Sequence, residues 1–176
     1  SYYYILDIDS GYLGQINPKE EIISYGDAVW AKDGNGIFMT SNEGSDFQHL
    51  KYYDLRNKKF MNLTQEIPWN VVEIAISKQG NKLAFVTNEE AISKLYILDT
   101  NTMKYEQVPE IPIGQIYRLK FHPDENQLAL VIYTDQTPGD VYVLNIQDYS
   151  LERWTYSEVG GLNTESFVGP ELIHYE

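Results

Sequence analysis

The sequence contains no cysteine, so it offers neither a disulfide framework nor thiolate chemistry. Basic residues are also few, with 13 Lys and Arg against 26 Asp and Glu, and the formal net charge is −13. Because phosphate backbones and anionic lipid surfaces are bound by positively charged surfaces, we expect no nucleic-acid partner and no membrane partner. The longest apolar runs, such as residues 128–133, are far shorter than the about 20 residues of a membrane-spanning helix.

A secretory signal is also missing from the start of this sequence. Residues 1–7 read SYYYILD, a strand-like run without the basic and then apolar segments of a signal peptide. Together with the lack of cysteine, this favours a cytoplasmic location. The hydrophobic content of 43% and aromatic content of 14% are typical of a packed globular protein, so we interpret the acidity as a solvated surface.

An internal repeat of 45 to 47 residues runs through the chain. The turn-containing stretches WAKDGNGIFMT, ISKQGNKLAFVT and FHPDENQLALVIY begin 46 and 45 residues apart. Short apolar and aromatic runs end in a polar residue at intervals of 47, 45 and 46 residues, namely at Asp7, Asp54, Asp99 and Asn145. Because independent markers keep the same register, we interpret the pattern as a structural repeat.

Each repeat is predicted to form four short β-strands. Within a repeat, apolar residues alternate with polar ones or form short runs between turn residues, and no helical period is sustained. In the repeat at 72–108 we expect strands at 72–77, 82–87, 94–98 and 104–108. A tight turn at 78–81 reverses the chain, and Gly80 supplies the positive φ that this turn requires.

Four-stranded units of this length are typical of the blades of a β-propeller. We therefore predict an all-β fold, a partial β-propeller with a half blade at 1–22 and complete blades at 27–63, 72–108 and 116–156. The propeller segment is expected to span 1–158. Because three and a half blades leave sheet faces and strand edges uncovered, we also expect the chain to associate with itself through these open faces.

Residues 40–176 resemble the propeller of the prolyl oligopeptidase family of serine peptidases, in the branch of the acylaminoacyl peptidases and dipeptidyl aminopeptidases. The resemblance lies in TSNEGSDFQHLKYYDL (40–55), ISKQGNKLAFVTNEE (76–90), FHPDENQLALVIYTDQTPGDVYVLN (121–145) and RWTYSEVGGLNTESFVGPELIHYE (153–176). The inner-strand stretches are similar to the general TolB-type repeat, whereas the last stretch resembles the exit from the final blade toward an α/β-hydrolase domain.

The resemblance implies that residues 159–176 are a linker toward an α/β-hydrolase domain that these residues do not include. A serine hydrolase nucleophile lies in a Gly-x-Ser-x-Gly elbow, and no glycine here is followed two positions later by serine. We therefore assign no catalytic residue to this chain. An alternative interpretation of the tail is a further blade, since Phe167 lies 46 residues after Phe121.

No metal or cofactor site is predicted. Asp7-Ile8-Asp9 and Asp33-Gly34-Asn35 place oxygen ligands at alternate positions, as calcium loops do, but neither continues to the glutamate of such a loop and both fall where the repeat requires turns. The three histidines are scattered and form no zinc motif. A propeller enzyme acting on polysaccharides would need a clustered acid pair, which is not apparent.

Two longer polar loops are the candidate contact sites. They connect the second and third strands of their repeats, at 42–47 and 134–139, and exceed a minimal hairpin in length. We expect them to line the substrate entrance or to face the hydrolase domain. The candidate residues are Asn42, Glu43, Ser45, Asp46, Asp135 and Gln136.

The functional hypothesis follows from the resemblance and the repeat together. The chain is expected to be the non-catalytic propeller of a prolyl oligopeptidase-like serine peptidase, which controls the access of peptide substrates to a catalytic domain outside it. The partners would then be peptides and the protein's own α/β-hydrolase domain. The alternative is a stand-alone TolB-type propeller that binds proteins through its loops.

Overall fold

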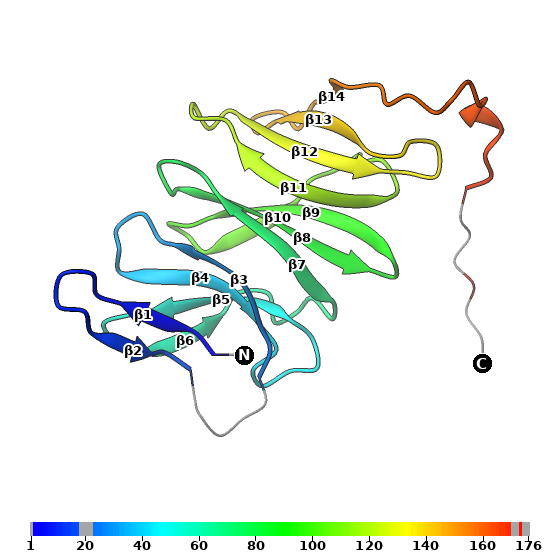
Figure 1. Ribbon diagram of the computed structural model, residues 1–176. Coiled ribbons are helices and arrows are strands. Elements are labelled where there is room, and N and C mark those ends of the chain that lie inside the picture. Colours follow the sequence, from blue (N-terminus) through cyan, green and yellow to red (C-terminus); the bar gives the residue numbers. More distant parts are fainter. Residues whose placement is uncertain (1, 18–22, 170–172, 174–176) are drawn as a thin grey trace. The chain divides into compact units, whose positions relative to one another are not determined.

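The computed structural model describes residues 2–17, 23–169 and 173 (Figure 1). Within these ranges the regular structure consists of antiparallel β-sheets and one short 3-10 turn, Thr164–Ser166. There is one two-stranded sheet and there are three four-stranded sheets, each with its strands in sequence order. The prediction of an all-β partial propeller is confirmed. No helix in the described part of the chain is long and apolar enough to span a membrane.

Residues 1–72 form one compact unit. It contains the half blade, β1 (Tyr4–Leu6) paired with β2 (Leu13–Gln15). It also contains the first blade, with β3 (Tyr25–Trp30), β4 (Gly36–Ser41), β5 (His49–Asp54) and β6 (Lys59–Asn62). Strand β4 is buried along its whole length, as expected for an inner strand covered on both faces.

Residues 73–176 form the second compact unit, and the boundary between the units falls within the first strand of the second blade. The second blade consists of β7 (Asn70–Ile76), β8 (Lys82–Glu89), β9 (Ile92–Asp99) and β10 (Lys104–Gln107). The third blade consists of β11 (Gln115–Phe121), β12 (Gln127–Tyr133), β13 (Asp140–Asn145) and β14 (Leu151–Arg153). The strands of the second blade begin and end within two residues of the ranges expected from the sequence.

The polar residues that mark the repeat are turn formers. They end the third strand of a blade, and their side chains accept hydrogen bonds from the N–H groups of the following turn, as Asp54 does from Arg56 and Asn57 at 2.8 and 2.9 Å. Asp99 binds Asn101 and Thr102 in the same way, at 2.9 and 3.0 Å. These hydrogen bonds lower the pKa of the Asp7, Asp54 and Asp99 carboxyls, because they stabilise the charged form.

The turns between the first two strands need a residue with positive φ. Gly34 and Gly80 supply it in the first two blades, with φ of 71° and 73°. In the third blade the equivalent residue is Glu125, with φ of 64°. Its carboxylate accepts a hydrogen bond from the backbone N–H of Gln79, in the equivalent turn of the second blade. This contact between blades helps to offset the cost of the left-handed conformation at a non-glycine residue.

One apolar cluster joins the second and third blades. From β8 and β9 it receives Ala84, Val86, Leu95 and Ile97, and from β12 and β13 it receives Leu128, Leu130, Ile132, Tyr142 and Leu144. All nine side chains are buried, and within each strand they occupy alternate positions. Each sheet therefore presents one face to the other. Burial of this surface is the main stabilising term for the second unit.

Candidate functional loops and the exit segment

The loop between β4 and β5 is held at its first residue, Asn42. The side-chain oxygen of Asn42 accepts a hydrogen bond of 2.7 Å from the N–H of Ser24, and its own N–H donates to the carbonyl of Ser24 at 3.2 Å. The carbonyl of Asn42 also accepts from the N–H of Ser45 at 3.0 Å. Asn42 therefore fixes the loop to the segment that precedes β3, and its role in the structure is that of an anchor.

Ser45 is a second anchor of this loop. Its hydroxyl oxygen accepts a hydrogen bond of 3.1 Å from the N–H of Phe47 and lies 2.9 Å from Nε2 of His49, the first residue of β5. The ring of Phe47 packs against that of Trp69, with centroids 6.3 Å apart. Both contacts restrict the path of the loop.

His49 has an unusual environment for a histidine. It is buried, and its Nδ1 has no hydrogen bond of ordinary geometry within the described residues. Burial lowers the pKa of His49, and the nearby cation of Lys51 lowers it further, while a weak interaction with the backbone of Thr64 acts in the opposite direction. His49 is therefore neutral at physiological pH.

Glu43 is fixed by a buried lysine. Nζ of Lys51 donates to the backbone carbonyl of Glu43 at 2.5 Å and lies 3.6 Å from its carboxylate. The side chain of Lys51 is 5% exposed. Burial lowers the pKa of this amine, and the charge and hydrogen bonding of Glu43 oppose that shift. Among the candidate residues of this loop, Asp46 alone has an exposed side chain, and it is the one most available for contact with a partner.

The loop between β12 and β13 is closed by two threonines. The hydroxyl groups of Thr134 and Thr137 lie 3.0 Å apart, and the hydroxyl oxygen of Thr134 accepts hydrogen bonds of 3.1 Å from the N–H groups of Gln136 and Thr137. The side chains of Asp135 and Gln136 are exposed at the tip. The second blade has no such loop, because its β8–β9 hairpin turns through Glu90 and Ala91, which both have positive φ.

Asp140 organises the segment that leaves the third blade, a role that sequence reasoning missed. Its buried carboxylate accepts hydrogen bonds from Arg153 at 2.6 Å, from the hydroxyl of Thr155 at 2.9 Å, and from the N–H and hydroxyl of Ser157 at 2.8 and 3.0 Å. Burial acts to raise the pKa of Asp140, but these donors outweigh it and the pKa is lowered.

The exit segment then lies over the β12–β13 loop. Asp135 and Gln136 line one pocket with Val159, Leu162 and Phe167, and Asp135 also lines a second pocket with Val168. Thr155 and Ser157 are two positions apart in the sequence, and both of their hydroxyl groups donate to the carboxylate of Asp140. The alternative interpretation, in which the tail begins another blade, falls largely outside the described residues.

The candidate residues therefore belong to different compact units. Asn42, Glu43, Ser45 and Asp46 lie in the first unit, whereas Asp135 and Gln136 lie in the second. The described residues contain no cluster of three or more side chains suited to a metal ion. Asp7 and Asp33, which resembled calcium ligands in the sequence, use their carboxylates to bind turn N–H groups.

The repeated four-stranded antiparallel sheets, and the packing of the second on the third, are those of a β-propeller domain. Residues 5–139 match the family described as the dipeptidyl peptidase IV (DPP IV) N-terminal region, and the chain belongs to this family. The resemblance to the TolB-type propellers of the prolyl oligopeptidase family is thereby confirmed.

Two solved structures show the same fold. A TolB from Acinetobacter baumannii superposes with a TM-score of 0.67 at 17% identity, covering 88% of this chain and 37% of that one. A structure from a study of two prolyl endopeptidases superposes with a TM-score of 0.71 at 16% identity, covering 88% of this chain and 22% of that one. The chain thus spans well under half the length of either. No curated protein sequence matches it.

Proposed function

We propose that this chain is the propeller portion of a serine peptidase of the prolyl oligopeptidase type and controls access to a catalytic domain outside these residues. The observation that carries the proposal is the family match across residues 5–139, which covers the half blade, two complete blades and the first two strands of the third. The sequence contributes no nucleophile elbow, so the chemistry would belong to the other domain.

The proposed mechanism is steric. The second and third blades, joined by an apolar cluster and by side chain to backbone hydrogen bonds, would form part of a rigid wall that admits short or extended peptides and excludes folded proteins. The exposed side chains of Asp46, Asp135 and Gln136 are the groups proposed to contact the peptide or the catalytic domain. Asn42, Glu43 and Ser45 would act by positioning their loop.

The first test is the intact mass of the natural gene product, measured by mass spectrometry on material from its source. A mass several times 20.4 kDa would support the proposal. A mass near 20.4 kDa would overturn it and favour the alternative, a small TolB-type propeller that binds proteins through its loops.

The second test addresses the gate in the longer product. Glu73→Ala removes a carboxylate that holds two neighbouring blades together. We expect this variant to cleave a folded protein substrate faster, relative to a blocked short peptide, than the unmodified protein does. An unchanged ratio of the two rates, with the second unit shown to be loosened by hydrogen exchange, would contradict the gate.

A further inference from the structure

The turn between β3 and β4 contains the only Asn-Gly dipeptide of the sequence, Asn35-Gly36. An asparagine side chain is open to attack by the backbone nitrogen of the residue that follows it. The attack is easiest when that residue is glycine, because glycine has no side chain to obstruct it. Asn35 is exposed, so water reaches its side-chain amide. This turn therefore combines a reactive dipeptide with access to solvent.

Packing of the first blade requires the glycine of this dipeptide. A Cβ at position 36 would lie 2.2 Å from the ring of Tyr52 in β5, which is too close for any side chain. The positive φ that the turn needs is supplied by Gly34, and Gly36 is not among the residues with positive φ. The close approach of Tyr52 therefore explains Gly36, whereas the geometry of the turn does not.

The equivalent turns of the second and third blades have the same backbone hydrogen bonds. Asn81 and Asn126 occupy the position of Asn35, at intervals of 46 and 45 residues. The carbonyl of each asparagine accepts a hydrogen bond from the turn that follows the third strand, from the N–H groups of Leu55, Thr100 and Ile146 at 3.0, 3.1 and 2.9 Å. The residue after each asparagine accepts one across its own turn at 2.9 Å, from Ala31, Ser77 and His122.

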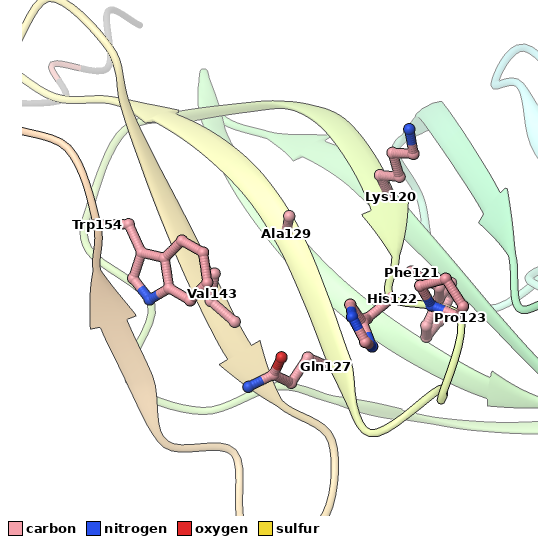
Figure 2. Close-up of a pocket in the computed structure, with 8 residues that line it drawn as sticks. All are labelled: Lys120, Phe121, His122, Pro123, Gln127, Ala129, Val143 and Trp154. Atoms are coloured by element: carbon pink, nitrogen blue, oxygen red, sulfur yellow. The ribbon is translucent and has the colours of Figure 1, made fainter.

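The residue that follows the asparagine distinguishes these three turns. It is Lys82 in the second blade and Gln127 in the third, where Figure 2 shows the side chain of Gln127 beside a shallow pocket. A side chain at this position obstructs the approach of the backbone nitrogen to the asparagine. Within the described turn at 31–36, the N–H of Gly36 donates no hydrogen bond, so its nitrogen is not held by the turn.

Asp33 restrains the reactive side chain. Its carboxylate accepts a hydrogen bond of 3.0 Å from the backbone N–H of Asn35 and one of 2.8 Å from the side-chain amide of Asn35. The amide must leave Asp33 before its nitrogen can depart. The negative charge of Asp33 also opposes the loss of a proton from the N–H of Gly36, which the attack requires. Both effects slow the reaction.

We propose that Asn35 is a site of spontaneous deamidation in the folded chain and that Asp33 sets its rate. The nitrogen of Gly36 loses its proton to hydroxide and forms a bond to Cγ of Asn35. The bond from Cγ to Nδ2 breaks, and the nitrogen takes up a proton and leaves as ammonia. Water then opens the resulting succinimide ring at one of its two carbonyl carbons, which yields an aspartate or an isoaspartate at position 35.

The two products differ in their effect on the first blade. Both place a new negative charge beside the carboxylate of Asp33. The isoaspartate also adds one atom to the main chain directly before β4, a strand that is buried along its whole length. It thereby displaces the carbonyl to which Leu55 donates. We expect the isoaspartyl chain to unfold at a lower temperature than the variant Asn35→Asp, which represents the other product.

Peptide mapping by mass spectrometry after incubation at mildly alkaline pH tests the proposal, and its outcome does not depend on the peptidase hypothesis. Asn35 is expected to change from amide to acid while Asn81 and Asn126 keep their amides. Asp33→Ala should speed this change, and Asn35→Gln should show none in this turn. Isomerisation at Asp33-Gly34 leaves the mass unchanged, so it is not counted. Circular dichroism before and after incubation shows whether each chain is folded.

A synthetic peptide of residues 31–38 shows the rate without the fold. If Asn35 of the folded chain keeps its amide under conditions that convert the peptide completely, the proposal is overturned. Equal conversion of Asn35, Asn81 and Asn126 would also overturn it, because the following residue would then have no effect. A rate in Asp33→Ala that is unchanged or slower would contradict the role of Asp33.

Discussion

The carboxylate of Glu73 accepts a hydrogen bond of 2.7 Å from the backbone N–H of Leu119, 46 residues further along the chain. Its other oxygen accepts from the N–H of Arg118 at 2.9 Å. The two N–H groups lie at a β-bulge in β11, between Tyr117 and Lys120, where pairing with β12 is interrupted and Arg118 has a φ of 61°. One side chain in the second blade thus binds backbone donors that the third blade leaves unpaired.

Glu73→Ala is expected to destabilise the second unit by about 2–3 kcal/mol, because it removes two charge-assisted hydrogen bonds and leaves two N–H groups without their acceptors. Glu73→Gln should cost less, since the amide oxygen still accepts one bond. The measurement is the midpoint of urea unfolding, compared with Glu158→Ala at an exposed position of the exit segment. Equal midpoints for Glu73→Ala and Glu158→Ala would show that the contact contributes nothing.

Asp140→Asn should release the exit segment. The substitution removes the negative charge opposite Arg153 in a site where the Asp140 side chain is 0% exposed, so we expect a loss of about 2–4 kcal/mol. Limited proteolysis should then cut after residue 154 sooner than in the unmodified chain. Asp148→Asn is the control, because the Asp148 carboxylate accepts hydrogen bonds from the N–H and hydroxyl of Ser150 in an exposed turn, and it should leave the cutting rate unchanged.

His49 should make the stability of the first unit pH-dependent. The pKa of His49 is lowered in the folded state, so the unfolded chain binds a proton more readily than the folded chain does. The contribution of neutral His49 to the free energy of unfolding is therefore complete above about pH 6.5, and it decreases as the pH falls below that value. Urea midpoints should decline as the pH is lowered through this range for the unmodified chain. The control variant His122→Gln should show the same decline, because the imidazole of His122 is exposed.

His49→Gln should remove this dependence while keeping a polar partner for Ser45. The carboxyls of Asp7, Asp54 and Asp99 also have a lowered pKa, but they act in a separate window, where stability falls as the pH drops below about 4. An identical pH profile for His49→Gln and the unmodified chain would contradict the assignment to His49.

Gly139 closes the β12–β13 loop with a φ of 108°, and a Cβ at this position would lie 2.6 Å from the ring of Tyr133. Gly139→Ala therefore combines backbone strain with a collision. Gly34→Ala introduces strain alone, because a Cβ there meets no atom within 4 Å. We expect Gly34→Ala to cost about 1 kcal/mol and Gly139→Ala clearly more, as measured by thermal unfolding. A smaller loss at Gly139 would show that the loop rearranges freely.

The sequence was sufficient to predict the blades because the repeat multiplies each local signal. A single Asp before a turn is a weak marker, but Asp7, Asp54 and Asp99 at a fixed interval define the end of one strand in successive copies. The β8–β9 strands could be placed for the same reason, since the turn at Gly80 and the marker at Asp99 bracket them.

The contacts of the candidate loops could not be predicted in this way. Whether His49 faces Ser45 or solvent depends on the register of β5 against its neighbours, and a shift of one residue reverses the face. The role of Asp140 depends on where the chain turns after β14, which no local propensity determines. The length and polarity of the loops predicted the candidate residues, and neither property distinguishes an anchor such as Asn42 from an exposed position such as Asp135.

The bonds from Glu73 to the β11 bulge and from Glu125 to Gln79 each join positions 45 or 46 residues apart. All of these bonds join the second blade to the third, so an insertion or a deletion within an inner strand of either blade would move a carboxylate away from its N–H partners. The contact between these two blades therefore limits changes in the number of residues within each of them.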